Sequence, residues 1–184
     1  EFEDLVTISD VATVLQRTEM VLRIRRDIDR YIVELGNEGR LIKMQLEELV
    51  SNVKEEGLLV IKDYKSEAEE EIDDLAAIFE KISSCSSDEL LSLSTISKYL
   101  GYGGNMNALD LSISPRGYRL LRKIPRLPMR VIENLVDSFD GFQEILNASI
   151  EELNDVDGVG EVRAQAIKEG LKRLRDQVLL DRHM

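Results

Sequence analysis

The sequence predicts an all-α protein with two parts: a helical bundle or spine over residues 1–110, and a smaller unit of two helical hairpins over residues 111–184. Apolar residues recur at helical spacing throughout the first part, and residues typical of helix N-caps stand before the expected helices. In the second part, a short turn motif between two helices occurs twice, 32 residues apart. These observations favour helices packed on helices in both parts.

The first helix is expected to begin at Ser9, a residue that favours the N-cap, and to end at Gly36, which tolerates left-handed backbone angles. Apolar residues recur every seven positions, and others widen the stripe: Val14, Val21, Ile28 and Leu35, with Val11, Leu15, Leu22, Ile24 and Ile32 beside them. This pattern predicts a long amphipathic helix.

Two further helices complete the expected bundle or spine. One starts near Gly39 and is weakened by Gly57, and its apolar stripe is Ile42, Leu46, Leu49, Val50, Val53, Val60 and Ile61. Ser66 with Glu69 forms a capping box that announces the other, whose apolar face is Ile72, Leu75, Ala76, Ile78 and Phe79.

Shorter elements are expected to lead to the second part. Helices are predicted over residues 88–93 and 95–100, and the glycine-rich residues 101–105 are the expected joint between the parts. Residues 96–101 are weakly similar to the start of a helix-turn-helix, and we interpret them as packing between domains. The acidic run at 67–74 is interpreted as a solvated helix face, because no histidine or calcium-loop spacing accompanies it.

Composition excludes several classes of protein. Of 184 residues 43% are hydrophobic, enough for a folded core, and the apolar runs are too short to cross a membrane. With only Cys85 and His183, the chain has no internal disulfide framework and no support for a zinc site or a histidine-based triad. A single cysteine suits a cytoplasmic protein. Because the sequence begins without Met or a secretory leader, we expect it to be part of a longer chain.

Charge is divided unevenly along the chain. The formal net charge is −12, of which −11 falls on residues 1–100. Between Asp110 and Glu133 there is no acid, and six cations occur there: Arg116, Arg119, Arg122, Lys123, Arg126 and Arg130. Any contact with nucleic acid therefore has to come from a local basic patch.

The most informative motif is the turn Gly158-Val159-Gly160. Ser149 with Glu152 forms a capping box for the helix before it, and Ala164 begins the apolar face of the helix after it. Two glycines around one inward-pointing apolar residue allow a tight turn and leave backbone N–H groups unobstructed at a helix start. Such a turn can bind an anion.

This turn is similar to the helix-hairpin-helix motif, which binds the DNA backbone without reading sequence. The expected DNA contacts of this copy are Gly158, Val159, Gly160, Val162, Arg163 and Lys168. Asp155, Asp157 and Glu161 flank the turn and repel phosphate. The plain alternative is an ordinary helical hairpin with a glycine-rich turn.

A second copy lies upstream, where residues 124–128 align with residues 156–160. Its first helix is expected to open at Ser114 and Pro115. Arg126 and Pro128 replace the two glycines, so side chains would contact phosphate in place of amides. The expected DNA contacts of this copy are Arg116, Arg119, Lys123, Arg126, Leu127 and Arg130. We expect weak, salt-sensitive binding that improves when distorted DNA engages both hairpins.

Residues 31–36, 38–41, 116–121 and 158–161, with the hairpins, closely resemble the DNA integrity scanning family of bacterial diadenylate cyclases over essentially the entire chain. The resemblance implies a spine and a tandem helix-hairpin-helix domain that follow a cyclase domain. It also implies synthesis of cyclic di-AMP from two ATP with Mg²⁺ or Mn²⁺, an octamer, inhibition by branched or junction DNA, and a place at the bacterial nucleoid.

The cyclase signatures of that family, Asp-Gly-Ala and Arg-His-Arg, do not occur in this sequence. We therefore expect no catalytic residue, metal or cofactor within these 184 residues. An independent enzyme in residues 1–110 has no support, since no nucleophile–base pair occurs there. The remaining alternative is an acidic helical scaffold whose degenerate hairpins bind another protein and not DNA.

Overall fold

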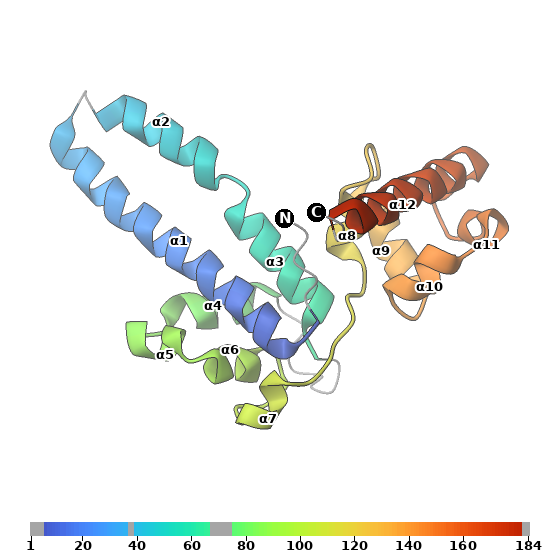
Figure 1. Cartoon of the computed structure of the whole chain (residues 1–184). Helices are drawn as coiled ribbons and strands as arrows, with labels where there is room; N and C mark the ends of the chain where they lie inside the picture. The colour runs from blue at the N-terminus through green and yellow to red at the C-terminus, as the bar shows by residue number, and fades with distance from the viewer. Residues whose placement is uncertain (1–5, 37–38, 67–74, 182–184) are drawn as a thin grey trace. The chain divides into compact units, whose positions relative to one another are not determined.

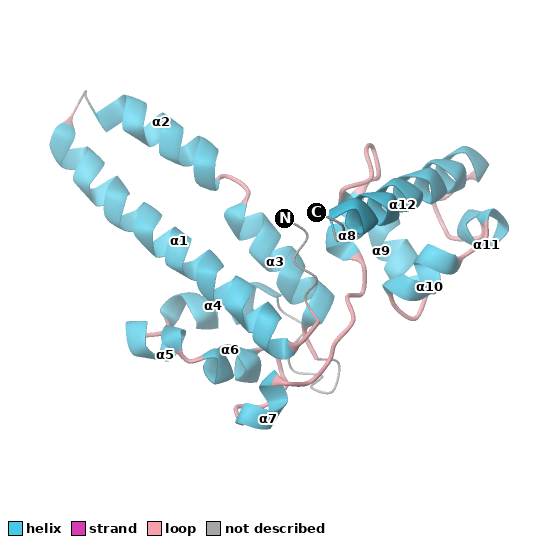
Figure 2. Ribbon diagram, viewed as in Figure 1, coloured by secondary structure: helices cyan, strands magenta, loops and turns pink. Residues whose placement is uncertain are grey.

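The computed structural model describes residues 6–36, 39–66 and 75–181. Within those ranges the chain is helices and connecting loops, with one isolated bridge and no strand (Figures 1 and 2). The all-α prediction is confirmed. None of the described helices combines the length and apolar character needed to cross a lipid bilayer.

The chain divides into two compact units, one spanning residues 5–113 and the other beginning at Ser114. The helices of the first unit are α1 (Ile8–Leu35), α2 (Gly39–Val50), α3 (Val53–Tyr64), α4 (Leu75–Ser84), α5 (Ser87–Leu91), α6 (Leu93–Tyr99) and α7 (Met106–Leu109). Those of the second are α8 (Tyr118–Arg122), α9 (Met129–Ser138), α10 (Phe142–Asn147), α11 (Ile150–Asn154) and α12 (Glu161–Asp181).

The long helix α1 organises the first unit. Helices α2 and α3 run back along it, and α4 and α6 pack against its N-terminal half (Figure 1). The core between them contains Val11, Ala12, Leu15, Leu22, Val60, Ile61, Tyr64, Ile78, Phe79, Ile82, Cys85, Leu90, Ile96 and Leu100. The start and end of the unit meet in a bridge between Thr7 and Ser112.

Helix α1 begins two residues earlier than predicted. Thr7, not Ser9, is the N-cap, because the Thr7 hydroxyl accepts the Asp10 N–H while the Asp10 carboxylate accepts the Thr7 N–H. The seven-residue series is not the buried face either, since Val21 and Leu35 are exposed while Val11 and Leu15 are buried.

The helix expected from Gly39 onward is two helices, broken at residues 51–52. Serine and asparagine compete for backbone hydrogen bonds, and the Ser51 hydroxyl donates to the Glu48 carbonyl at the break. Gly57 lies inside α3, where a Cβ atom would stand 2.9 Å from Thr18 Cγ2, so this glycine permits close packing against α1.

Exposed apolar side chains cover much of the helical hairpin formed by the end of α1 and by α2. They include Ile24, Tyr31, Val33, Leu41, Ile42, Met44 and Leu49. The predicted stripe of α2 is therefore only partly buried within this unit: Ile42 is exposed and Val50 is buried.

The remaining predictions for the first unit concern its short helices, the glycine-rich segment and the acidic run. The predicted helices at 88–93 and 95–100 correspond to α5 and α6, with shifted ends. Ile96 and Leu100 are fully buried in the core of the first unit, so this segment packs within that unit, whereas packing between domains was expected. The glycine-rich residues 101–105 form a turn between α6 and α7, a helix that the sequence analysis did not predict. Glu69, Ile72 and the acidic run lie outside the described residues.

Candidate nucleic-acid interface

The two hairpins of the second unit repeat each other with an offset of 32 residues. Helix α8 ends at Arg122 and α11 at Asn154, whereas α9 begins at Met129 and α12 at Glu161. The intervening residues adopt the same succession of turns. The predicted duplication is therefore present.

The helix before the first hairpin does not open at Ser114 and Pro115 as predicted. The Phe142 N–H donates to the Pro115 carbonyl, which ties this segment to the start of α10 instead. Gly117 follows with φ of +123°, so α8 begins only at Tyr118. The capping box of α11, formed by Ser149 and Glu152, is confirmed.

Each turn is held by its own backbone and one buried anchor. The Leu127 N–H donates to the Ile124 carbonyl at 3.4 Å, and the matching Val159 N–H donates to the Val156 carbonyl at 2.9 Å. Val159 is buried as predicted. Because its N–H is used inside the turn, the amides that remain for an anion are those at Gly160 and the start of α12.

Arg126 and Gly158 stand at matching positions and both have positive φ, +62° and +78°. Arg126 is the only non-glycine residue with positive φ in the described ranges. Left-handed backbone costs an ordinary residue roughly 1–2 kcal/mol, which glycine avoids. The first hairpin thus keeps the backbone path of the second and places an exposed cation on it.

The helix starts differ in the donors they offer. A Cβ atom at Gly160 would meet nothing within 4 Å, so there is open space beside this residue at the start of α12. Pro128, the matching residue of the first hairpin, has no N–H. The second hairpin therefore supplies backbone amides where the first cannot.

The basic residues predicted to contact DNA in the first hairpin differ in their exposure to solvent. Lys123, Arg126 and Arg130 are exposed, whereas Arg116 and Arg119 are half-buried. In the second hairpin, Arg163 donates to the carbonyl of Gly158. Its guanidinium therefore lies at the turn that was expected to bind phosphate.

The Lys168 side chain forms hydrogen bonds within the fold. Its ammonium donates to the carbonyl of Leu146 at 3.1 Å and also to that of Ala148. These carbonyls lie at the C-terminal end of α10, where a cation is favourable. Lys168 therefore stabilises the end of α10.

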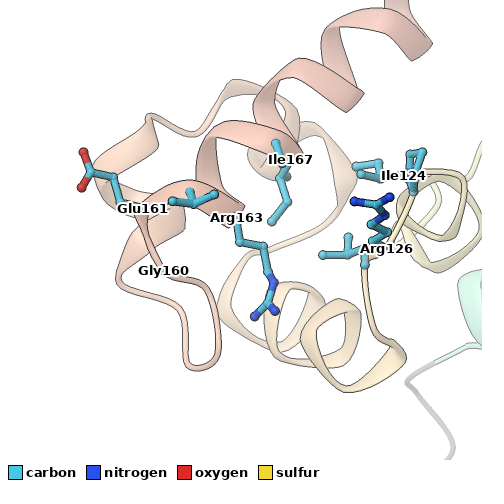
Figure 3. Close-up of a pocket in the computed structure, with 10 residues that line it drawn as sticks. Ile124, Arg126, Gly160, Glu161, Arg163 and Ile167 are labelled. Atoms are coloured by element: carbon cyan, nitrogen blue, oxygen red, sulfur yellow. The ribbon is translucent and has the colours of Figure 1, made fainter.

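A groove of about 600 Å³ joins the first hairpin to the start of α12. In Figure 3, Arg126 reaches toward it from the first hairpin and Arg163 from α12, while Glu161 points away from both. The apolar floor includes Ile124, Leu127 and Ile167. The groove thus brings together five predicted contacts: Arg126, Leu127, Gly160, Val162 and Arg163.

Asn134 holds the two hairpins together and was not predicted from the sequence. The Asn134 amide on α9 donates to the Asp157 carbonyl at 2.8 Å, which ties the second turn to the second helix of the first hairpin. No sequence signal marks Asn134. Ile124 and Ile167 were named from the sequence, Ile124 in the segment that aligns with residues 156–160 and Ile167 on the apolar face of the helix after the second turn, and both are buried. Among the described side chains no group has the composition of a metal site.

Comparison with known proteins gives two family matches. Residues 1–109 match the DisA bacterial checkpoint controller linker region, and residues 141–170 match the helix-hairpin-helix motif. The second match contains the Gly158–Gly160 turn.

Similar proteins carry the name DNA integrity scanning protein DisA. That of Carboxydothermus hydrogenoformans is 59% identical over 177 residues, covering 96% of this chain and 50% of the relative. That of Acetivibrio thermocellus is 54% identical over 181 residues, covering 98% of this chain and 49% of the relative. The chain spans about half the length of these relatives.

Proposed function

The chain belongs to the family of the DisA bacterial checkpoint controller linker region, and from that premise we propose that its hairpin unit binds the sugar-phosphate backbone of DNA without reading sequence. One observation carries the proposal. Two hairpin turns of the same backbone path meet at one groove, with Arg126 on one side and the Gly160 amide and Arg163 on the other.

The donors at this face suit phosphate oxygens better than base edges. Amides at a helix start and arginine side chains bind phosphate by charge and position, and such contacts carry no sequence information. The two hairpins supply different phosphate-binding groups. The first offers cations without the Pro128 amide, and the second offers amides beside acidic Asp155 and Asp157.

Both hairpins have to engage for useful affinity, since each is incomplete alone. DNA whose strands diverge or bend, such as a four-way junction, presents backbones at more angles than a straight duplex. Branched DNA is therefore the proposed preferred ligand. The acidity of the rest of the chain weakens this binding, and the release of counterions at each phosphate contact makes it sensitive to salt.

Relatives twice as long place this unit in a larger protein. We propose that the longer protein makes cyclic di-AMP from two ATP with Mg²⁺ or Mn²⁺, assembles as an octamer, and loses cyclase output when branched DNA binds. Catalysis is assigned to the half outside this chain. These 184 residues, incubated with ATP and either metal, are expected to yield no cyclic di-AMP.

A scaffold that binds protein through degenerate hairpins is the second candidate. Pro128 and the acids around the second turn favour it, because each weakens phosphate binding. Fluorescence anisotropy with a labelled junction and a matched duplex at two salt concentrations separates the two functions. Saturable, salt-sensitive binding by the native chain that weakens in Gly160→Val supports DNA binding, whereas no binding at low salt supports the scaffold.

A further inference from the structure

Gly170 lies in the middle of α12, where a glycine is costly. Glycine inside a helix is less favourable than alanine. Its surroundings explain its presence, because a Cβ atom there would stand 2.9 Å from Ile124 Cγ1, 3.0 Å from Cγ2 and 3.2 Å from Cδ1. The α12 backbone thus approaches the Ile124 side chain more closely than any other residue type allows.

Ile124 cannot readily move aside. It is buried and β-branched, which restricts its rotamers. It is also built into the first hairpin turn, because its N–H donates to the Leu121 carbonyl at 3.0 Å and its carbonyl accepts the Leu127 N–H. A displacement of Ile124 therefore displaces the turn that carries Arg126.

Helix α12 is rigidly joined to the other hairpin. It starts directly after Gly160, and Gly170 is about 15 Å further along its axis at the usual helical rise. Ile167, one turn before Gly170, is fully buried and lines the same groove as Ile124. The contact of Gly170 with Ile124 therefore limits how closely α12, which carries the second turn at its start, approaches the first turn.

We propose that Gly170 is a positioning residue that sets the spacing of the two hairpin turns, so that both engage phosphates of one DNA molecule. This inference rests on the proposed function. A methyl group at residue 170 pushes α12 away from the first turn and widens the groove. Each hairpin keeps its own phosphate-binding groups, but the two turns can no longer bind phosphates of the same DNA molecule at once.

The test compares Gly170→Ala with the matched control Gln165→Ala, an exposed position on the same helix. Circular dichroism and thermal unfolding establish that both variants are folded. Anisotropy titrations at several salt concentrations then measure Kd and its salt dependence. For Gly170→Ala we expect Kd to rise at least about tenfold, as when one of two linked sites is lost, and the salt slope to fall by about 0.9 for each lost phosphate contact.

A double variant distinguishes a change in the spacing of the two turns from a general loss of structure. Ile124→Ala removes all three atoms that the new methyl group would meet, so the double variant Gly170→Ala/Ile124→Ala is expected to regain the salt slope that Gly170→Ala loses. A Gly170→Ala chain with native Kd and slope would overturn the inference, as would weaker binding with no rescue in the double variant.

NMR amide signals recorded without DNA test the spacing of the turns independently of whether the chain binds DNA. If Gly170→Ala shifts the amide signals of Arg126 and Gly160 while Gln165→Ala does not, the two turns have moved as proposed. If the native chain binds no DNA at all, the proposed function fails, and unmoved amide signals would overturn the spacing inference independently.

Discussion

Arg126 and Gly158 occupy the same position in two hairpins 32 residues apart, and both have positive φ, at +62° and +78°. One hairpin uses the residue type best suited to that backbone. The other accepts strain and gains an exposed cation at the edge of the groove. Strained residues of this kind concentrate at functional sites.

Replacing Arg126 with glycine should weaken DNA binding without weakening the fold. Relief of left-handed strain offsets the flexibility that glycine adds, so the free energy of unfolding should change by less than about 1 kcal/mol. The loss of one phosphate contact should lower the salt slope by about 0.9. Arg126→Asn is the matched control, because asparagine tolerates positive φ without the charge. Native affinity in both variants would contradict a phosphate-binding Arg126.

The two glycines of the second turn should respond differently to alanine. Gly158→Ala places a side chain at φ of +78° and should cost about 1 kcal/mol of stability. Gly160→Ala meets nothing within 4 Å and has no left-handed strain, so it should cost less stability than Gly158→Ala, while Kd rises because the methyl group crowds the start of α12 where phosphate is expected to bind. Urea unfolding and anisotropy on both variants test this. Unaltered Kd in Gly160→Ala would contradict phosphate binding at the start of α12.

A buried ion pair should govern the stability of the first unit. Glu19 is 1% exposed and its Oε1 accepts from Arg23 Nε at 3.0 Å and from Arg26 Nη2 at 2.7 Å. Arg23→Ala removes a hydrogen bond to a buried carboxylate while Arg26 still pairs with Glu19, so it should cost roughly 1.5–3 kcal/mol. Arg30 pairs with Asp27 at the surface, so Arg30→Ala should cost less than about 1 kcal/mol. Equal costs for the two variants, measured by urea unfolding, would refute this assignment.

The N-terminal cap of α1 should make the free energy of unfolding depend on pH in the acidic range. The Thr7 N–H and hydroxyl hydrogen bonds lower the pKa of the Asp10 carboxyl below its ordinary value of 3.8. The folded state therefore holds this proton more weakly than the unfolded state, so the cap contributes fully above pH 3.8 and is lost as the pH falls through the lowered pKa. Asp10→Asn should be less stable than the native chain at pH 7, with the gap closing toward pH 2. A gap that is constant with pH would contradict this role.

The sequence analysis succeeded where the pattern is local and repeated. The Ser149–Glu152 capping box, the inward Val159 and the offset between the hairpins are properties of a few neighbouring residues, and the structure contains all three. The helix start at Thr7 was within reach of the same rule, because Thr7 and Asp10 have capping-box spacing.

Contacts between distant residues could not be predicted in the same way. Gly57 was expected to weaken its helix, yet it permits a close approach to the Thr18 side chain, and Gly170, which no sequence pattern marks, permits a close approach to Ile124. Lys168 was predicted as a phosphate contact from its charge alone, and its hydrogen bonds to the carbonyls of Leu146 and Ala148 could not be read from the sequence. Charge can be counted from a sequence, but its partners depend on the packing.

Amide chemical-shift mapping of the native chain with an unlabelled four-way junction tests the central claim most directly. Our account predicts that the largest shifts fall on Gly160, Glu161 and Val162 and on Arg126 and Leu127, and that they diminish when salt is raised. Shifts confined to the exposed apolar face of α1 and α2, or none at a junction concentration far above that of the protein, would contradict binding through the hairpins.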